Sequence, residues 1–198
     1  MASHFFAYIS KIRWIVRWGL NRNIISENVM EHSWEVAAIA HALGVIRNRV
    51  CDGNVDVHIL ATAALYHDCS EVITGDIPSP IKYHSTEIQT AYKTIEHQAG
   101  NALLNLLPSE LRSDFAAVMT EENLSDELRT LIKAADMLSA YLKCQAELNA
   151  GNKEFVKASE SLCAQLTHLA LPEVNYFLSV FVPSFELTVD ELQYHQEG

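Results

Sequence analysis

The spacing of hydrophobic residues is helical nearly throughout this chain, and this feature constrains the fold more than any other. Apolar residues recur every three to four positions, which gathers them on one face of an α-helix. No segment alternates convincingly with the period of a half-buried β-strand; residues 181–187 come nearest, but Pro183 interrupts them. Helices are expected over 4–18, 28–48, 55–74, 86–107, 109–121, 126–150, 153–170 and 172–181.

Residues that break or cap helices separate these segments. Residues 52–54 (Asp-Gly-Asn) and the proline-containing run 75–80 cannot continue a helix, Ser125 is a suitable N-cap, and Pro172 suits a first turn. The sequence contains no repeat, low-complexity tract or interdomain linker. We therefore expect residues 1–198 to form one all-α domain, a compact multi-helix bundle.

The composition limits the classes of partner. A net charge of −11 argues against binding of DNA or RNA, which requires Lys and Arg to neutralise phosphates, but a small anion needs only one local positive pocket. Lys11, Arg13, Arg17 and Arg22 form either such a pocket or a solvated helix face. No apolar run approaches the ~20 residues of a membrane span, and neither a signal peptide nor a C-x-x-C pair is present. These features favour a cytoplasmic protein that does not bind membranes.

Polar residues with metal-binding chemistry interrupt three of the expected apolar faces. His67 and Asp68 fall inside the alanine-rich helix 55–74, where an unpaired carboxylate would cost several kcal/mol. His32 lies on the apolar face of 28–48, and Asp136 lies at the edge of the apolar face of 126–150. Two imidazoles and two carboxylates would suit one divalent ion such as Mn, Co, Fe, Zn or Cu.

Each of these residues also has an ordinary interpretation. A histidine on an apolar face is often a core residue with satisfied hydrogen bonds, and Asp136 could pair with Lys133 or Lys143. Cys69 points about 100° away from Asp68 around a helix, so we interpret it as a small buried thiol. The metal interpretation therefore rests on the joint inward placement of the four residues.

The order H…HD…D resembles the HD-domain superfamily of metal-dependent phosphohydrolases. Longer segments resemble the bacterial 5′-deoxynucleotidases of the YfbR type, namely HFFAYISKIRWIVRWGLNRN, SENVMEHSWEVA, YHDCSEVITGDIPSPIK, KAADMLSAYLKC and FVPSF. The similarity covers essentially the whole chain. It implies an all-helical homodimer that hydrolyses deoxyribonucleoside 5′-monophosphates to deoxynucleoside and phosphate.

The resemblance also implies roles for individual residues. The metal ligands would be His32, His67, Asp68 and Asp136, and Glu71 would be the carboxylate beside the metal that handles protons. The residues implied in substrate binding are Arg17, Trp18, Asp68, Asp76, Ile77, Pro78, Ser79 and Asp136.

Elementary chemistry agrees with these roles but leaves alternatives. Arg17 can offer a forked pair of donors to phosphate or be an exposed helix-end charge, and Trp18 can wall a nucleotide pocket or belong to the core. Asp76 can bind a sugar hydroxyl or cap the turn at Gly75. Glu71 and Asp76 are both candidates for protonating the departing 5′-oxygen.

The sequence argues against three competing functions. Hydrolases of the alarmone (p)ppGpp resemble an H-D-x-x-E-D pattern, but Val72 follows Glu71 here. A cyclic-dinucleotide phosphodiesterase of the HD-GYP kind needs further ligands and a G-Y-P segment, and the sequence has neither. A non-catalytic nucleotide-binding helical protein would not need a complete set of metal ligands, so the presence of all four argues against it.

Overall fold

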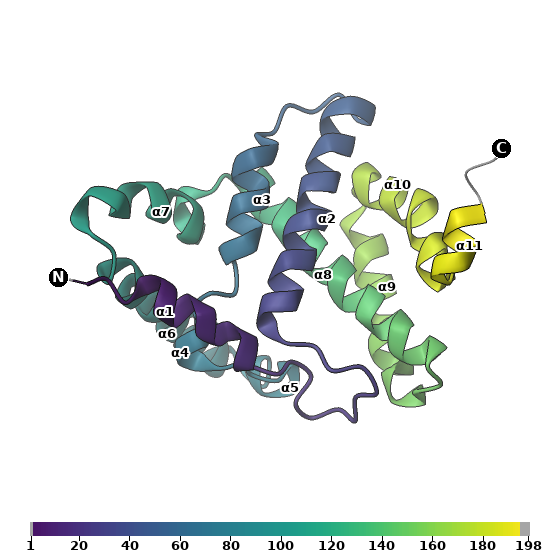
Figure 1. Ribbon diagram of the computed structural model, residues 1–198, viewed down its shortest axis with the longest axis horizontal. Coiled ribbons are helices and arrows are strands. Elements are labelled where there is room, and N and C mark those ends of the chain that lie inside the picture. Colours follow the sequence, from purple (N-terminus) through teal and green to yellow (C-terminus); the bar gives the residue numbers. More distant parts are fainter. Residues whose placement is uncertain (1, 195–198) are drawn as a thin grey trace.

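The computed structural model describes residues 2–194, and its elements are helices (Figure 1). Within these residues, the isolated bridge between Val16 and Asn28 is the one β-type pairing. The all-α prediction is confirmed. The elements are α1 (Phe5–Ile9), η1 (Ser10–Trp14), α2 (Val29–Val50), α3 (Val57–Tyr66), α4 (Glu71–Thr74), α5 (Ser79–Lys82), α6 (Thr86–Asn105), η2 (Ser109–Leu111), α7 (Arg112–Met119), η3 (Glu121–Asn123), α8 (Asp126–Asn149), η4 (Lys153–Phe155), α9 (Val156–Leu169), α10 (Pro172–Val180), η5 (Val182–Glu186) and α11 (Val189–Tyr194).

Helix α2 runs through the middle of the molecule and packs against α3, α8 and α10 (Figure 1). It begins in a capping box: the Asn28 side chain accepts the backbone N–H groups of Met30 and Glu31, and Glu31 accepts the N–H of Asn28. Its buried residues Val36 and Leu43 belong to the main hydrophobic cluster, which α3, α8 and α10 complete. This packing brings the first turns of α2 against the middle of α8, where Ser139 contacts His32 and Glu35.

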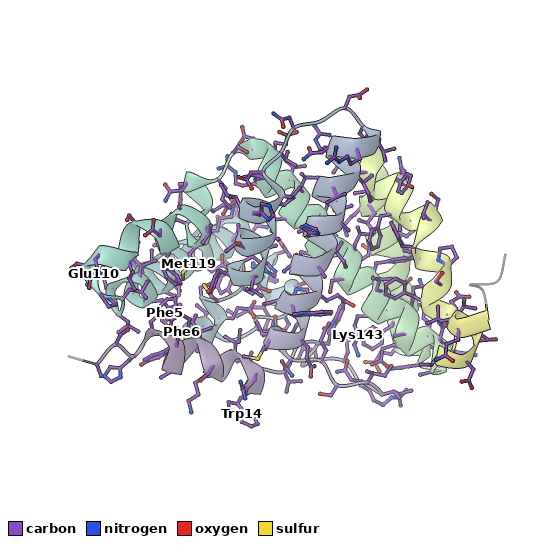
Figure 2. The ribbon with its side chains drawn as sticks, turned by 45° about the horizontal axis from the view of Figure 1, so that its top comes forward. Phe5, Phe6, Trp14, Glu110, Met119 and Lys143 are labelled. Atoms are coloured by element: carbon purple, nitrogen blue, oxygen red, sulfur yellow. The ribbon has the colours of Figure 1, made fainter. Side chains whose placement is uncertain are left out.

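A second hydrophobic cluster lies at the end of the molecule that holds the N-terminus. Phe5 is completely buried there with Leu103 of α6, and its ring meets that of Phe115 edge-to-face at 5.1 Å. Figure 2 shows Phe5 and Phe6 close to Met119 at this end, whereas Lys143 lies on the other side of the molecule.

The prediction of one helix over 4–18 was wrong at its C-terminal end. Helical structure stops at Trp14, and the following residues pair with the segment before α2. Arg17 N–H donates to Glu27 O at 3.0 Å, and Val29 N–H donates to Ile15 O at 3.0 Å. Backbone groups that would have continued the helix are therefore used in this pairing, so Arg17 lies on a loop and not at a helix end.

The prediction of one helix over 55–74 was also wrong, because the helix breaks at the His-Asp pair. Helix α3 ends at Tyr66, and a turn over 67–70 precedes the short helix α4. The carbonyl of Ala64 accepts both the backbone N–H of His67 at 3.4 Å and its ring Nδ1 at 2.7 Å. Local bonds of the i→i−3 type, such as Cys69 N to Tyr66 O, replace the helical pattern.

The other predicted helices are confirmed to within a few residues, with short 3₁₀ turns opening the α7 and α9 segments. The sequence did not predict α5, η3, η5 or α11. In the part of the chain that the structure describes, no helix combines the length and apolarity needed to cross a membrane.

Candidate active site

The structure brings the four predicted metal ligands together from three elements. His32 comes from α2, Asp136 from α8, and His67 and Asp68 from the turn after α3. His32 Nε2 lies 3.0 Å from Asp136 Oδ1 and 3.6 Å from Asp68 Oδ2, and His67 Nε2 lies 3.1 Å from Asp68 Oδ2. The ligand atoms of His32, His67 and Asp68 all lie within 4.8 Å of one another.

Hydrogen bonds set the tautomer of both histidines. His67 Nδ1 faces the carbonyl oxygen of Ala64, which can only accept, so Nδ1 carries the proton. His32 Nδ1 lies 3.1 Å from Ser139 Oγ, whose own proton goes to Glu35 Oε2 at 2.6 Å, so Nδ1 again donates. In the neutral form of both rings the lone pair is consequently left on Nε2, the atom that faces the carboxylates.

Unpartnered atoms and charge fit a divalent cation at this point. Both Nε2 atoms are buried and have no hydrogen-bond partner among residues 2–194. Burial by itself would lower the pKa of His67, but the nearby carboxylates of Asp68 and then Asp136 outweigh it and raise this pKa to about 9. The site thus attracts positive charge strongly, and two carboxylates with two neutral imidazoles are a donor set for a first-row divalent metal.

Arg17 and Trp18 approach the cluster from the loop before α2. Arg17 Nε donates to Glu27 Oε2 at 3.2 Å, and Arg17 Nη1 donates to Asp68 Oδ2 at 3.4 Å. Trp18 Nε1 donates to the same Glu27 oxygen at 2.9 Å. Trp18 has φ +59°, a strained value for a bulky residue, and its ring packs on Phe155 at 5.3 Å between centroids. Glu27 therefore fixes both side chains relative to Asp68.

A buried glutamate on α8 holds this loop. Glu147 is completely buried and accepts the backbone N–H groups of Ile24 and Ile25 at 3.0 Å each, the Asn152 side chain at 2.8 Å, and Lys143. Lys143 also donates to the carbonyl oxygen of Ile25. Burial would raise the pKa of Glu147, but these donors outweigh it and lower the pKa to about 2.

We expect Glu147→Gln to lower the free energy of unfolding by about 3 kcal/mol at pH 7, because it leaves Lys143 buried without its counter-charge. A carboxylate with a depressed pKa stabilises the fold above its ordinary pKa of 4.5, and that stabilisation is lost as pH falls toward 2. Urea unfolding of the wild type and of Glu147→Gln should therefore show a difference in the free energy of unfolding that narrows below pH ~4.5. A difference in the free energy of unfolding that does not depend on pH would contradict a stabilising role of the ionised Glu147 carboxylate.

One cavity of about 700 Å³ is lined by all the predicted substrate residues except Asp68. Arg17, Trp18 and Asp136 line it on one side, and the turn before α5 supplies Asp76 through Ser79 on another. The structure adds residues that the sequence did not single out, chiefly from α8 and α9: Gly19, Leu20, Asn21, Pro80, Tyr83, Lys133, Met137, Ala140, Ala158, Ser161, Leu162 and Gln165. The cavity therefore combines Asp136 of the ligand cluster with both polar and apolar side chains.

Glu71 lies beside the cluster without belonging to it. It is 7% exposed, and its Oε2 has no hydrogen-bond partner within the described chain. Burial, together with the charges of Asp68 and Asp76, raises its pKa to about 9, and burial also raises the pKa of Asp76. A carboxyl group in this setting is able to hold and transfer a proton near neutral pH.

Some supporting residues were missed by sequence reasoning. Glu27, Glu35 and Ser139 orient Arg17, Trp18 and His32, but each looks like an ordinary polar residue until the helices are packed. Cys69 is buried, as expected, and Trp34 is 69% exposed.

Comparison with known proteins identifies the family. The family model for YfbR-like 5′-deoxynucleotidases matches residues 4–185 of this chain. The chain belongs to the YfbR-like 5′-deoxynucleotidase family. It is 50% identical over 190 residues to 5′-deoxynucleotidases of Yersinia pestis strain Pestoides F and Yersinia pseudotuberculosis serotype O:1b, with 96% of this chain and 96% of each relative covered.

Solved structures share the fold at lower identity. An HD-domain phosphohydrolase from Listeria innocua superposes with a TM-score of 0.80 at 23% identity, over 96% of this chain and 92% of that one. The cyanophage S-2L HD phosphohydrolase DatZ, bound to dA and one catalytic Zn²⁺ ion, gives 0.71 at 21% identity, over 90% and 96%. These similarities establish the HD-domain fold for this member of the YfbR-like family.

Proposed function

We propose that this protein hydrolyses deoxyribonucleoside 5′-monophosphates with one divalent metal ion held by His32, His67, Asp68 and Asp136. The observation that carries the proposal is the cavity of about 700 Å³, which extends from the ligand cluster to Trp18 and the 76–79 turn. Its size suits a nucleotide, and its lining combines charged, aromatic and apolar side chains. The names of the 50%-identical relatives support the same substrate class.

The substrate phosphate belongs at the polar end of the cavity. A bound divalent ion supplies Lewis acidity, which makes water a better nucleophile and polarises a phosphoryl oxygen. Arg17 lies 3.4 Å from Asp68, so its guanidinium can reach a phosphate at the cluster and stabilise the charge that develops on its oxygens. Glu27 keeps the Arg17 side chain in place during this step.

Two carboxyl groups are available for proton transfer. Glu71 is proposed to take the proton of the attacking water or to relay it, because its unpartnered oxygen is buried beside the cluster and the charge of a bound divalent ion would lower its raised pKa. Asp76 lines the nucleoside side of the cavity and can bind a sugar hydroxyl or protonate the departing 5′-oxygen. Trp18, held by Glu27 and Phe155, forms the wall against which the nucleoside packs.

The sugar preference is tested by comparing dAMP with AMP. We expect kcat/KM for dAMP to exceed that for AMP at least ~10-fold, because a wall packed against C2′ leaves an added hydroxyl without room or partner. Phosphate release should be measured for both nucleotides with each of several divalent metals, which also identifies the best metal. Equal kcat/KM values would reduce the assignment to a general HD phosphohydrolase. Trp18→Ala should narrow the difference in kcat/KM between dAMP and AMP, while the metal content stays unchanged.

A homodimer and a cytoplasmic location complete the proposal. Trp14 and Trp34 are 74% and 69% exposed, and Figure 2 shows Trp14 projecting from the edge of the molecule. Large exposed aromatic side chains are typical of protein interfaces. A nucleotide substrate suits the cytoplasm, where these compounds are made.

A further inference from the structure

The substrate cavity is short of positive charge for a dianionic phosphate. Asp76 and Asp136 line it, and Glu27, Asp68 and Glu71 lie immediately behind its polar end. Arg17 and Lys133 are the two cations in its lining. Arg17 is already paired, at 3.2 Å with Glu27 and at 3.4 Å with Asp68.

Lys133 is not neutralised in this way. Lys133 is exposed and lies three residues before Asp136 on α8. Its side chain has no hydrogen bond or ion pair with any part of the chain that the structure describes. Two nearby cations, in contrast, are engaged: Lys82 pairs with Glu96 at 3.0 Å, and Arg129 pairs with Asp126.

Lys133 also marks a boundary between two cavities. A second cavity of about 810 Å³ is lined by His67, Lys82 and Lys93, among others, and Lys133 lines both this cavity and the substrate cavity. Arg17 and Asp136 line the first cavity and His67 lines the second, so the ligand cluster lies between them. In-line hydrolysis needs water on the side of phosphorus opposite the leaving oxygen. With the nucleoside in the first cavity, the second cavity is on the side from which water arrives and phosphate departs.

We propose that Lys133 binds the phosphoryl group of the substrate, and then the product phosphate, at the junction of the two cavities. This inference rests on the proposed function for the substrate but concerns a residue to which neither the sequence motifs nor the metal site assigns a role. The Lys133 ammonium group would contact the phosphoryl oxygens from α8, whereas Arg17 approaches from the loop before α2, and so supply the second positive charge that the phosphate needs.

The test compares Lys133→Met with Lys93→Met. Lys93 is an exposed lysine that lines only the second cavity and likewise has no partner in the described residues, so it matches Lys133 in charge, exposure and surroundings. Binding of inorganic phosphate and of deoxyadenosine to the metal-loaded proteins is measured by calorimetry. Lys133→Met should weaken phosphate binding about 10-fold or more, leave deoxyadenosine binding within about 2-fold, and raise KM for dAMP. Lys93→Met should change none of these values by more than about 2-fold.

Lys133→Arg, which keeps the positive charge, should retain most of the phosphate affinity that Lys133→Met loses. A purely structural role of the lysine side chain would not depend on this charge. Unchanged phosphate binding in Lys133→Met overturns the inference, and so does an equal loss in Lys93→Met, which would indicate a general field effect. A wild-type protein that binds phosphate through Lys133 but releases none from dAMP would overturn the proposed function and leave this inference intact.

Discussion

Asp68→Asn should remove both the bound metal and the activity. Asp68 Oδ2 lies within 3.6 Å of both histidine Nε2 atoms and 3.4 Å from Arg17, so it contacts both proposed histidine ligands and the arginine. Loss of its charge removes one of two anionic ligands, and we expect kcat/KM to fall at least ~1000-fold with less than a tenth of the wild-type metal content. Elemental analysis and phosphate release from dAMP measure the two effects.

Asp76→Asn is the matched control for this change. Asp76 lines the substrate cavity but is not one of the proposed ligands, so its variant should keep the metal. Added divalent ion should raise the melting temperature of the wild type and of Asp76→Asn, but not that of Asp68→Asn. Full metal occupancy in Asp68→Asn would remove this residue from the ligand set.

Glu71→Gln should separate binding from chemistry. The substitution preserves the shape of a buried side chain beside the cluster but removes its ability to exchange a proton, so kcat should fall by ~100-fold or more. Metal content and affinity for dAMP should remain close to wild type, since Glu71 lies beside the ligand cluster. Single-turnover kinetics and elemental analysis provide the measurements.

The neighbouring Cys69→Ala variant controls for local packing. Cys69 is buried two residues away and belongs to the hydrophobic cluster around Phe5, so its loss perturbs packing without touching a proton-transfer group. It should retain kcat within a few-fold. If Glu71→Gln turns over at nearly the wild-type rate, Glu71 is structural and another group handles the proton.

The sequence by itself determined the helical class, the long helices and the likeness to a family. Periodicity and capping act over one or two turns, so α2, α6, α8 and α10 were predicted closely. His32 and Asp136 lie within such helices, and their inward direction follows from the apolar residues one turn away. These properties depend on neighbours in sequence and are therefore readable from it.

Only the tertiary structure decided where the remaining site residues lie. The helix break at His67 arises because a side chain and the backbone share one carbonyl group, and the end of η1 arises because residues 15–17 pair with residues 27–29. The loop that carries Arg17 and Trp18 is held by Glu147, which lies 122 positions after Ile25. Lys133 lines both cavities only because α8 packs against distant segments of the chain, α3 among them. Hydrogen bonds and cavities between distant segments leave no periodic trace in the chain, since they form only after the helices pack.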